Sequence, residues 1–467
     1  MNVLRGSLLT HTLLVGAAVH ASIPVLHAQQ PGYAVDSEAL VQRLQVAEQR
    51  IAELESIRPR EEPKEPVTLK INGRIHLDSW SFADESEGIR FFENPLTGVD
   101  PEDRVFFRRI RLRFEGDIFD NMEYRMQIDF GSPEDPQMKD VYIGFKDLPL
   151  LRTLLVGNQK RPLGLDHLNS SRFNVFMERP LVVEAFNEDA RRVGIASYGV
   201  SADEVYNWRY GFYALENMAD DGEIIGDSRQ MSFNLRLAGS PWYDEVCDGR
   251  TYFHWAVAGM FARPDGDANP LDTNANLGRF RTRSELRSDE RWLDTGPIAG
   301  ADWYEILGLE TIFNAGPLQV VGEYQANWLE RDGTTPGTGP DLFFHGAYVY
   351  MAYMLTGEHV PYDRRSGTIG RVTPFSNCSL VNRARGGAGP GWGAWQVALR
   401  YSYLDLTDED IRGGIENNLT FALVWYFNPH AALQFNAIYG DIEDHEPVGG
   451  FTDGHFTALG TRLRIDF

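Results

Sequence analysis

The amino-acid sequence predicts an all-β protein, a sixteen-stranded antiparallel transmembrane β-barrel with a short N-terminal coiled-coil helix. Two observations lead to this prediction. From residue 67 onward, apolar and polar residues alternate with a period of two, as they do in a strand with two different faces. No stretch offers the roughly 18 uninterrupted apolar residues of a helical membrane span, whereas a barrel strand needs only about 9–11 alternating residues.

Residues 1–28 are predicted to be a secretory signal peptide. Arg5 gives the stretch a basic start, and Leu8–Val19 is an apolar segment too short to span a bilayer. Ala28 stands immediately before the expected cleavage point. We therefore expect the chain to be exported.

Residues 29–66 are predicted to hold a periplasmic coiled-coil helix followed by a linker. Apolar residues recur at spacings of four and three, which is the a/d seam of a coiled coil: Leu40, Leu44, Ala47, Ile51 and Leu54. Two heptads alone are marginal, so we expect partner helices and a role in assembling a trimer. A lone amphipathic helix is the alternative. The Pro- and charge-rich stretch 58–66 is the linker.

The C-terminal segment shows the strand pattern best. Leu463 and Ile465 share one face, Arg462 and Arg464 share the other, and the chain ends on the aromatic Phe467. The same alternation predicts sixteen strands, an even number that suits a closed barrel, at 67–82, 104–118, 121–131, 137–147, 152–160, 190–200, 205–217, 229–239, 251–262, 302–314, 317–330, 345–357, 392–405, 415–428, 431–442 and 455–467. Longer loops are expected at 83–103, 161–189, 263–300 and 331–344.

A soluble β-sandwich would also show alternating residues. Two features favour a barrel in the outer membrane. Charges recur on the polar face of strand after strand, and aromatic residues gather at strand ends, for example Trp80 with Phe82 and Tyr401 with Tyr403. Membrane barrels carry such aromatic girdles at the interfaces of the bilayer.

The composition excludes several kinds of function. A net charge of -23 argues against nucleic acid as a partner, because such proteins need a basic face. No HExxH, GxSxG, GxGxxG or Walker A motif is present, so we expect no enzyme, no cofactor and no metal. For the two cysteines, Cys247 and Cys378, inert thiols are favoured over a disulfide.

Several stretches match a known family in order. They are LKINGRIHLDSW, FFRRIRLRF, GNQKRPLGLDHLNSSRFNVFMERPL, YMLTGEHVPYDRRSGTIGRVTP, GAWQVALRYSYLDL, NNLTFALVWYFNPHAALQFNAIYG and the terminal strand. Together, over about residues 67–467, they make the sequence resemble the phosphate- and polyphosphate-selective porins. The resemblance implies a homotrimer of barrels in outer-membrane lipid. It also implies an inward-folded third extracellular loop and a water-filled channel for inorganic phosphate or other small anions.

The resemblance also assigns residues to the anion pathway. Arg74 matches the basic residue of the first strand, and its parity points it into the lumen. Arg108 and Arg109 match a double arginine that opens the second strand, and Arg179 matches the arginine that ends the constriction loop. The segment GRFRTRSELR resembles the family's arginine-rich loop, which gives Arg279, Arg281, Arg283, Arg287 and the following Arg291 as a ladder.

The sequence departs from the family pattern at the constriction. His167 stands where a lysine is expected, and Lys160 and Arg161 just before it are candidates to compensate. Arg111 stands where a tyrosine is expected. These departures bear on phosphate specificity more than on anion preference.

Arginine suits an anion pathway because its planar fork of donors matches two phosphate oxygens and its charge does not titrate in the usual pH range. Two questions remain open at this level. The ladder could be a solvated loop with internal ion pairs to Glu285, Asp289 or Glu290, and the orientation of Arg108 depends on where its strand begins. A general porin, or a barrel with a structural or adhesive role and no conductance, are the alternative functions.

Overall fold

The computed structural model describes residues 66–132, 136–188, 190–217, 229–269, 275–382 and 388–467, and a few residues near the N-terminus. The chain divides into two units, Met1–Lys64 and Glu65–Phe467. In the first unit the described residues, Gln42, Gln45, Val46 and Glu48–Arg50, are all helical. The signal peptide and the five residues of the predicted a/d seam lie outside the described residues, so the signal peptide and the coiled coil stay predictions.

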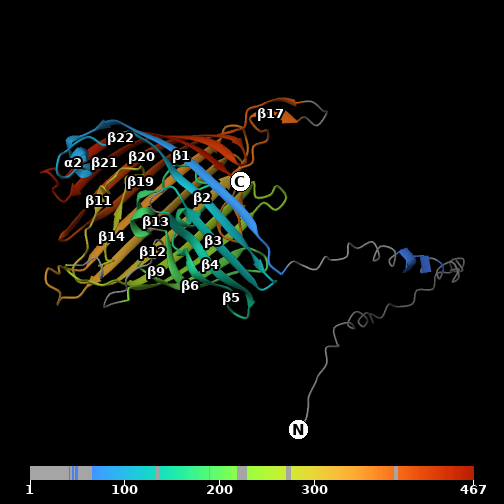
Figure 1. Ribbon diagram of the computed structural model, residues 1–467, viewed down its shortest axis with the longest axis horizontal. Helices are drawn as coiled ribbons and strands as arrows, with labels where there is room; N and C mark the ends of the chain where they lie inside the picture. The colour runs from blue at the N-terminus through green and yellow to red at the C-terminus, as the bar shows by residue number, and fades with distance from the viewer. Residues whose placement is uncertain are drawn as a thin grey trace, which may run out of the picture. The chain divides into compact units, whose positions relative to one another are not determined.

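The second unit is a closed barrel of sixteen antiparallel strands in chain order, with β22 paired to β1 (Figure 1). The strands are β1 (Lys70–Glu85), β2 (Arg104–Ile118), β3 (Met122–Asp129), β4 (Gln137–Leu148), β5 (Arg152–Lys160), β6 (Arg191–Val200), β7 (Tyr206–Ala214), β8 (Met231–Tyr243), β9 (Thr251–Arg263), β12 (Ala301–Ala315), β13 (Leu318–Arg331), β14 (Leu342–Met354), β19 (Ala394–Asp408), β20 (Ile411–Asn428), β21 (Ala431–His445) and β22 (Gly454–Asp466).

The predicted fold class is confirmed. Each of the sixteen predicted strands corresponds to one barrel strand, and the ends differ by at most four residues, as at the start of β20 and the end of β8. Elements outside the wall are short: α2 (Glu87–Glu93), α3 (Leu165–Leu168), α4 (Leu181–Phe186), and the hairpins β10–β11 (Arg281–Thr282, Leu293–Asp294), β15–β16 (Tyr362–Asp363, Thr368–Ile369) and β17–β18 (Ser379–Asn382, Ala388–Gly391). None of the helices in the described part of the chain is long and apolar enough to span a membrane.

Side chains alternate between the two sides of the wall as the sequence predicted. On β22, Leu463 and Ile465 are exposed on the outside, and Arg462 and Arg464 are buried on the inside. The outer face is therefore apolar and the inner face polar, as a bilayer around the barrel requires.

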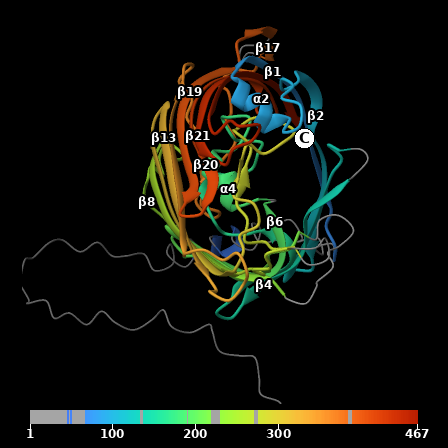
Figure 2. The same ribbon diagram turned by 90° about the vertical axis from the view of Figure 1, so that its left-hand side faces the viewer.

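Three connections fold into the barrel. Residues 161–188, with α3 and α4, and residues 275–300, with β10–β11, come from the end of the barrel where β1 ends and β22 begins. Residues 358–372, with β15–β16, connect β14 to β19 and come from the other end, where β1 begins and β22 ends. Figure 2 shows α4 enclosed by the ring of strands.

The inward segments pack against one part of the wall only. Phe280 lies edge-on to Phe186 of α4, with ring centroids 5.6 Å apart, and contacts Tyr304 and Phe344 of the wall at 5.3 and 5.8 Å. Fully buried members of this apolar cluster come from β1, β9, β12–β14 and β19–β22, and none of the described residues of β2–β8 is among them. The space beside β2–β7 is therefore left open.

Candidate functional site

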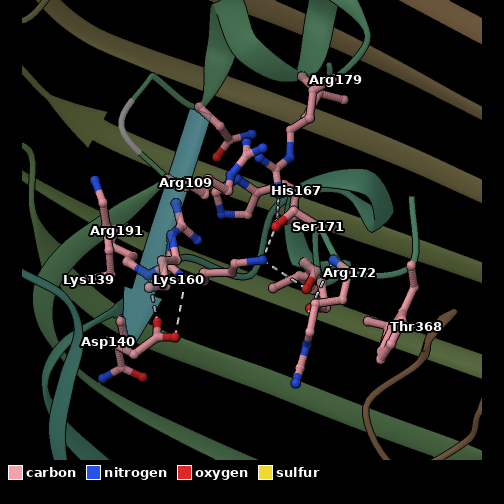
Figure 3. Close-up of a pocket in the computed structure, with 18 of the residues that line it drawn as sticks. Arg109, Lys139, Asp140, Lys160, His167, Ser171, Arg172, Arg179, Arg191 and Thr368 are labelled. Atoms are coloured by element: carbon pink, nitrogen blue, oxygen red, sulfur yellow. Dashed lines mark hydrogen bonds and ion pairs between the residues drawn. The ribbon is translucent and has the colours of Figure 1, made fainter. Parts of the chain in front are cut away.

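A cavity of about 620 Å³ fills this space. Residues of β1–β7 form one side of it, and the inward segments form the other. We call it the main cavity, and Figure 3 shows part of its lining.

The lining of the main cavity is strongly cationic. Fifteen arginine and lysine side chains line it against five aspartate and glutamate side chains, whereas the whole chain has 44 basic and 67 acidic residues. The basic residues are Arg74, Arg108, Arg109, Arg111, Arg113, Arg125, Lys139, Lys160, Arg172, Arg179, Arg191, Arg209, Arg283, Arg287 and Arg291. The barrel thus carries an interior whose charge is opposite to that of the protein.

All seven residues predicted for the constriction line this cavity: Arg74, Arg108, Arg109, Arg111, Lys160, His167 and Arg179. Arg74 on β1 faces Arg111 across the β1–β2 pair, and its guanidinium donates to the Ser171 hydroxyl at 2.8 Å. Arg109 pairs with His76 in the same register, so Arg74 and Arg109 are diagonal neighbours on the inner face. Strand alternation alone accounts for these two positions.

Arg108 reaches the cavity for a different reason. The register between β1 and β2 passes from His76 opposite Arg109 to Leu77 opposite Phe107, which leaves Arg108 as the extra residue of a β-bulge. A bulge can re-aim a side chain, so two consecutive arginines line the lumen. Arg108 then forms a two-pronged ion pair with Glu178 at 2.8 and 2.9 Å.

Glu178 holds residues 161–188, here called the constriction loop, against the wall. Besides Arg108 it accepts a bond at 2.6 Å from Arg462, which also pairs with Asp78. Burial raises the pKa of the Glu178 carboxyl, but the charges of Arg108 and Arg462 outweigh burial and hold it well below its usual range. This carboxylate is therefore ionised, and it offsets much of the charge of Arg108.

Lys160 and Arg179 hold the constriction loop from inside. The Lys160 ammonium donates to the carbonyl oxygens of His167, Leu168 and Asn169 at 2.7, 3.0 and 2.9 Å (Figure 3). Arg179 donates to the Asp166 carbonyl at 3.1 Å and pairs with the Asp166 carboxylate at 3.3 Å. An ammonium has three donors. All three N–H donors of Lys160 are used in these hydrogen bonds. Its positive charge still adds to the electrostatic potential of the cavity, but it has no donor left for an anion.

His167 is enclosed at the base of this loop. Its side chain is buried, and its Nε2 has no hydrogen-bond partner in the described part of the chain. Burial, followed by the charges of Lys160 and Arg179, holds the pKa of the ring well below its usual range. His167 is thus a neutral side chain and does not supply the cation expected at this position.

The predicted arginine ladder divides between two cavities. Arg283, Arg287 and Arg291 line the main cavity, and Arg279 and Arg281 line a separate side cavity of about 380 Å³. The ion-pair partners of the ladder come mainly from the constriction loop rather than from the acids interleaved with it. Glu188 lies 2.8 Å from Arg281 and 2.7 Å from Arg291, and Glu184 lies 3.9 Å from Arg283.

The interleaved acids have other partners. Glu285 pairs with Arg400 of β19, and Asp289 pairs with Arg104 at the start of β2. Arg279 does pair within its own segment, with Asp294 at 2.8 Å. The ladder is thus an inward-folded element tied to the wall, not a solvated loop.

Four arginines that line the main cavity have no carboxylate within ion-pair distance among the described residues: Arg74, Arg109, Arg209 and Arg287. The Nε atoms of Arg109 and Arg287 are buried without a partner. Repulsion by Arg108, followed by burial, lowers the pKa of Arg287 to about 9, so the group is still charged at neutral pH.

Other cations of the main cavity were not among the predicted site residues: Arg113, Arg125, Lys139, Arg172, Arg191 and Arg209. Arg113 and Arg125 stand on polar faces of predicted strands, so alternation could have found them. Both share Glu115, at 2.9 Å each. Arg191 is paired with Asp140 at 2.7 Å and was not separable by sequence from an ordinary wall residue.

The described residues contain no group of three or more His, Cys, Asp or Glu side chains placed to hold a metal ion. Both cysteines are free thiols; Cys247 is exposed and Cys378 is partly so. They belong to the segments outside the barrel wall and do not line the main cavity.

Comparison with known proteins agrees with this architecture. Two solved structures of OmpT, an outer membrane protein of Vibrio cholerae, cover 86% of this chain and 100% of their own. The loop L8 deletion mutant has 9% identity and a TM-score of 0.51, and the in-vitro folded trimer form has 10% identity and a TM-score of 0.50. At such identities the likeness shows the fold alone.

Relatives are found by sequence as well. Porin O of Pseudomonas aeruginosa is 23% identical over 439 residues, 86% of this chain and 88% of that protein. An uncharacterized protein of Caulobacter vibrioides is 28% identical over 374 residues, 77% of this chain and 68% of that protein. The family described as phosphate-selective porin O and P matches residues 87–467. The protein is an outer-membrane β-barrel of the porin type, and it belongs to the family of phosphate-selective porins O and P.

Proposed function

We propose that this porin is a water-filled, anion-selective diffusion channel that prefers inorganic phosphate among small anions. The observation that carries the proposal is the reversal of charge inside the barrel, with fifteen basic and five acidic side chains around the main cavity of a chain whose net charge is -23. Charges that line a low-dielectric wall focus the field, so the interior attracts anions although the protein as a whole is acidic.

Arg74, Arg109 and Arg287 are proposed as the side chains that an anion meets. Arg74 and Arg109 are diagonal neighbours on the inner face, and neither forms an ion pair with a described acid. A guanidinium can donate to two oxygens of one phosphate. Several such sites of modest affinity suit conduction, because an ion that binds must also leave.

The other predicted residues of the site receive supporting roles in this proposal. Lys160 and Arg179 shape the constriction loop through its backbone oxygens, and Arg108 holds it through Glu178. Arg111 pairs with Asp129 at 2.6 Å. Their positive charges still contribute to the field, so they favour anions without binding one directly.

The mouth of the pore continues the cationic lining. A cavity of about 580 Å³ at the start of β2 shares Arg108, Arg111, Lys139 and Arg287 with the main cavity. We propose that anions enter here, at the end of the barrel where β1 ends and β2 begins. The family description names phosphate selectivity, which supports phosphate as the preferred anion.

The test is single-channel conductance in a planar bilayer. Across a potassium chloride gradient, the reversal potential should show chloride passing in preference to potassium. Phosphate titrated into chloride should then reduce the chloride current in a saturable way. Preference for potassium would contradict the anion channel, an anion current that phosphate does not slow would leave a general porin, and the absence of conductance would favour a structural role.

We also propose a homotrimer that sits in outer-membrane lipid. The apolar outer face supports the lipid contact, and the a/d seam of residues 40–54 supports assembly. The trimer form of OmpT from Vibrio cholerae shows that a protein of similar fold assembles this way. Deletion of residues 29–60 should weaken the trimer without removing the barrel; cross-linking of the intact protein that traps monomers alone would contradict this.

A further inference from the structure

Glu323 of β13 is a buried carboxyl group that contacts the constriction loop from the part of the wall that carries the apolar cluster. Its two oxygens accept hydrogen bonds from the backbone N–H groups of Leu165 and Asp166 at 2.8 and 2.7 Å. The hydroxyl of Tyr348, its register partner on β14, donates to the same carboxyl group. Glu323 lines none of the three cavities described above, so an anion in the main cavity does not touch it.

The partners of Glu323 are hydrogen-bond donors of the loop and the wall rather than a cation. Glu310, its register partner on β12, pairs with Arg236 at 2.7 Å. No cation in the described part of the chain pairs with Glu323 in the same way. A buried acceptor that loses its donors is costly. The position of the loop and the hydrogen bonding of this carboxyl group therefore depend on each other.

Gly164 makes the close approach of Glu323 possible. Its φ is +87°, a conformation that glycine adopts without strain. A Cβ at this position would lie 2.9 Å from Oε2 of Glu323 and 3.0 Å from Nε2 of Gln325. A larger residue would therefore separate the loop from the carboxyl group.

Lys160 holds the same short turn, α3, from the other part of the wall. Its ammonium, at the end of β5, donates to the carbonyl oxygens of His167, Leu168 and Asn169. Glu323 thus binds the N–H groups where the turn begins, and Lys160 binds the carbonyl groups where it ends. The turn is held between two distant parts of the wall by partners of opposite kind.

The residues that follow α3 form one edge of the passage. Ser170 and Ser171 line the main cavity, and the Ser171 hydroxyl accepts a hydrogen bond from Arg74 at 2.8 Å. The side-chain oxygen of Asn169 accepts a hydrogen bond from the backbone of Ile369 on β16 at 3.0 Å. A displacement of α3 therefore moves this edge relative to Arg74 and changes the width of the passage.

We propose that Glu323 is a positioning residue that fixes how far α3 reaches into the lumen, and that it thereby sets the size of anion that the neck admits. It acts through the backbone of Leu165 and Asp166 and not by contact with the ion. This inference rests on the proposed anion channel and adds to it a residue that determines size selection.

E323Q tests the proposal in planar bilayers. Glutamine has the same shape, but one accepting oxygen becomes an NH₂ donor that faces a backbone N–H group. Phosphate block of chloride current should weaken about three- to tenfold, as expected for the loss of one buried hydrogen bond. Gluconate, a larger anion than chloride, should carry a greater share of the current. The preference for chloride over potassium should persist, because the cations that line the cavity are unchanged.

The matched control is E330Q, which makes the same change at an exposed residue near the end of the same strand and outside the three cavities. It should retain the phosphate block and the gluconate permeability of the wild type. Equal values in E323Q and E330Q would overturn the role of Glu323. Loss of the preference for chloride in E323Q would also overturn it, because the residue would then act through the charge of the pore.

Two further variants examine the contact itself. G164A places a Cβ against the carboxyl group, so it should weaken phosphate block in the same direction as E323Q. If both act through one contact, the effects in the double variant E323Q/G164A should be less than additive, and additive effects would contradict a shared contact.

Y348F removes one donor and keeps both hydrogen bonds to the loop, so it should give a smaller shift than E323Q. It also decides the question if E323Q does not form the heat-modifiable band of a folded barrel in electrophoresis. In that case an unchanged phosphate block in Y348F would overturn the proposal. A wild-type pore that prefers potassium would overturn the proposed function, and this inference with it.

Discussion

The two parts of the barrel wall use the same sequence pattern for opposite purposes. Strands β9–β22 have inward residues such as Phe344, Leu404 and Val424 that are covered by the inward segments and form an apolar core. Strands β1–β7 have inward arginines that face the main cavity. The inward segments therefore do not fill the barrel evenly. They pack on one part of the wall and leave a cationic passage along the other.

This division explains how a narrow pore stays both open and rigid. The constriction loop is held on its packed side by rings such as Phe176 against Tyr350, with centroids 5.5 Å apart. On its open side it is held by ion pairs such as Arg108 with Glu178. Apolar packing fixes the position of the constriction loop, and ion pairs fix the face of the loop that lines the cavity.

The largest effect is expected from Phe280→Ala, which removes a ring from the apolar side of the constriction loop. Loss of a buried phenylalanine ring costs about 3–5 kcal/mol, here in contacts that hold α4 and the ladder against the wall. Single-channel conductance should rise and phosphate block should weaken more than tenfold as the inward segments loosen. Phe421→Ala is the control, because that ring lies on the outer face of β20 and is 46% exposed. An unchanged pore in Phe280→Ala would show that packing does not hold the constriction.

A smaller change in free energy is expected from Arg109→Ala, which removes a cation from the open side. A hydrogen bond to a charged group contributes about 1.5–3 kcal/mol, so phosphate affinity, measured as block of chloride current, should fall about tenfold to hundredfold. Arg412→Ala removes an exposed arginine paired with Asp444 at 3.0 Å and should change affinity by less than about 1 kcal/mol. If the two variants lost affinity equally, the open side would carry no specific site.

The smallest effect is a pH dependence of stability from His167, which lies where the two sides meet. Its folded pKa lies well below the usual range because of burial and then of Lys160 and Arg179, whereas in the unfolded chain the ring takes up a proton near pH 6.5. This contribution to stability is complete above about pH 6.5. It falls by about 1.4 kcal/mol per pH unit below that, until the folded ring is protonated as well.

His167→Gln should remove this dependence. The midpoint of guanidinium unfolding, compared at pH 7.5 and 5.5, should shift less in His167→Gln than in the wild type. His359→Gln, at a partly exposed histidine outside the cavities, is the control and should retain the wild-type shift. Equal shifts in all three proteins would contradict a buried neutral His167.

The strands of the barrel wall could be predicted from local sequence patterns. Period-two alternation is a local property of a strand, so the number of strands, their order and the inward orientation of Arg74 and Arg109 follow from residues that are neighbours in the chain. The ladder motif likewise identified five arginines that do reach the interior. Alternation could also have found Arg113 and Arg125.

The partner of each charged side chain depends on the tertiary structure. Arg108 faces the lumen because of a bulge that depends on its register with β1. Lys160 donates hydrogen bonds to backbone oxygens, and no side-chain motif predicts such partners. Arg462 pairs with Asp78, which is 384 residues away in the sequence. Whether an arginine is available to an anion depends on which acid approaches it. That depends on how distant segments fold into the barrel, because charges interact through space while sequence patterns record only neighbours.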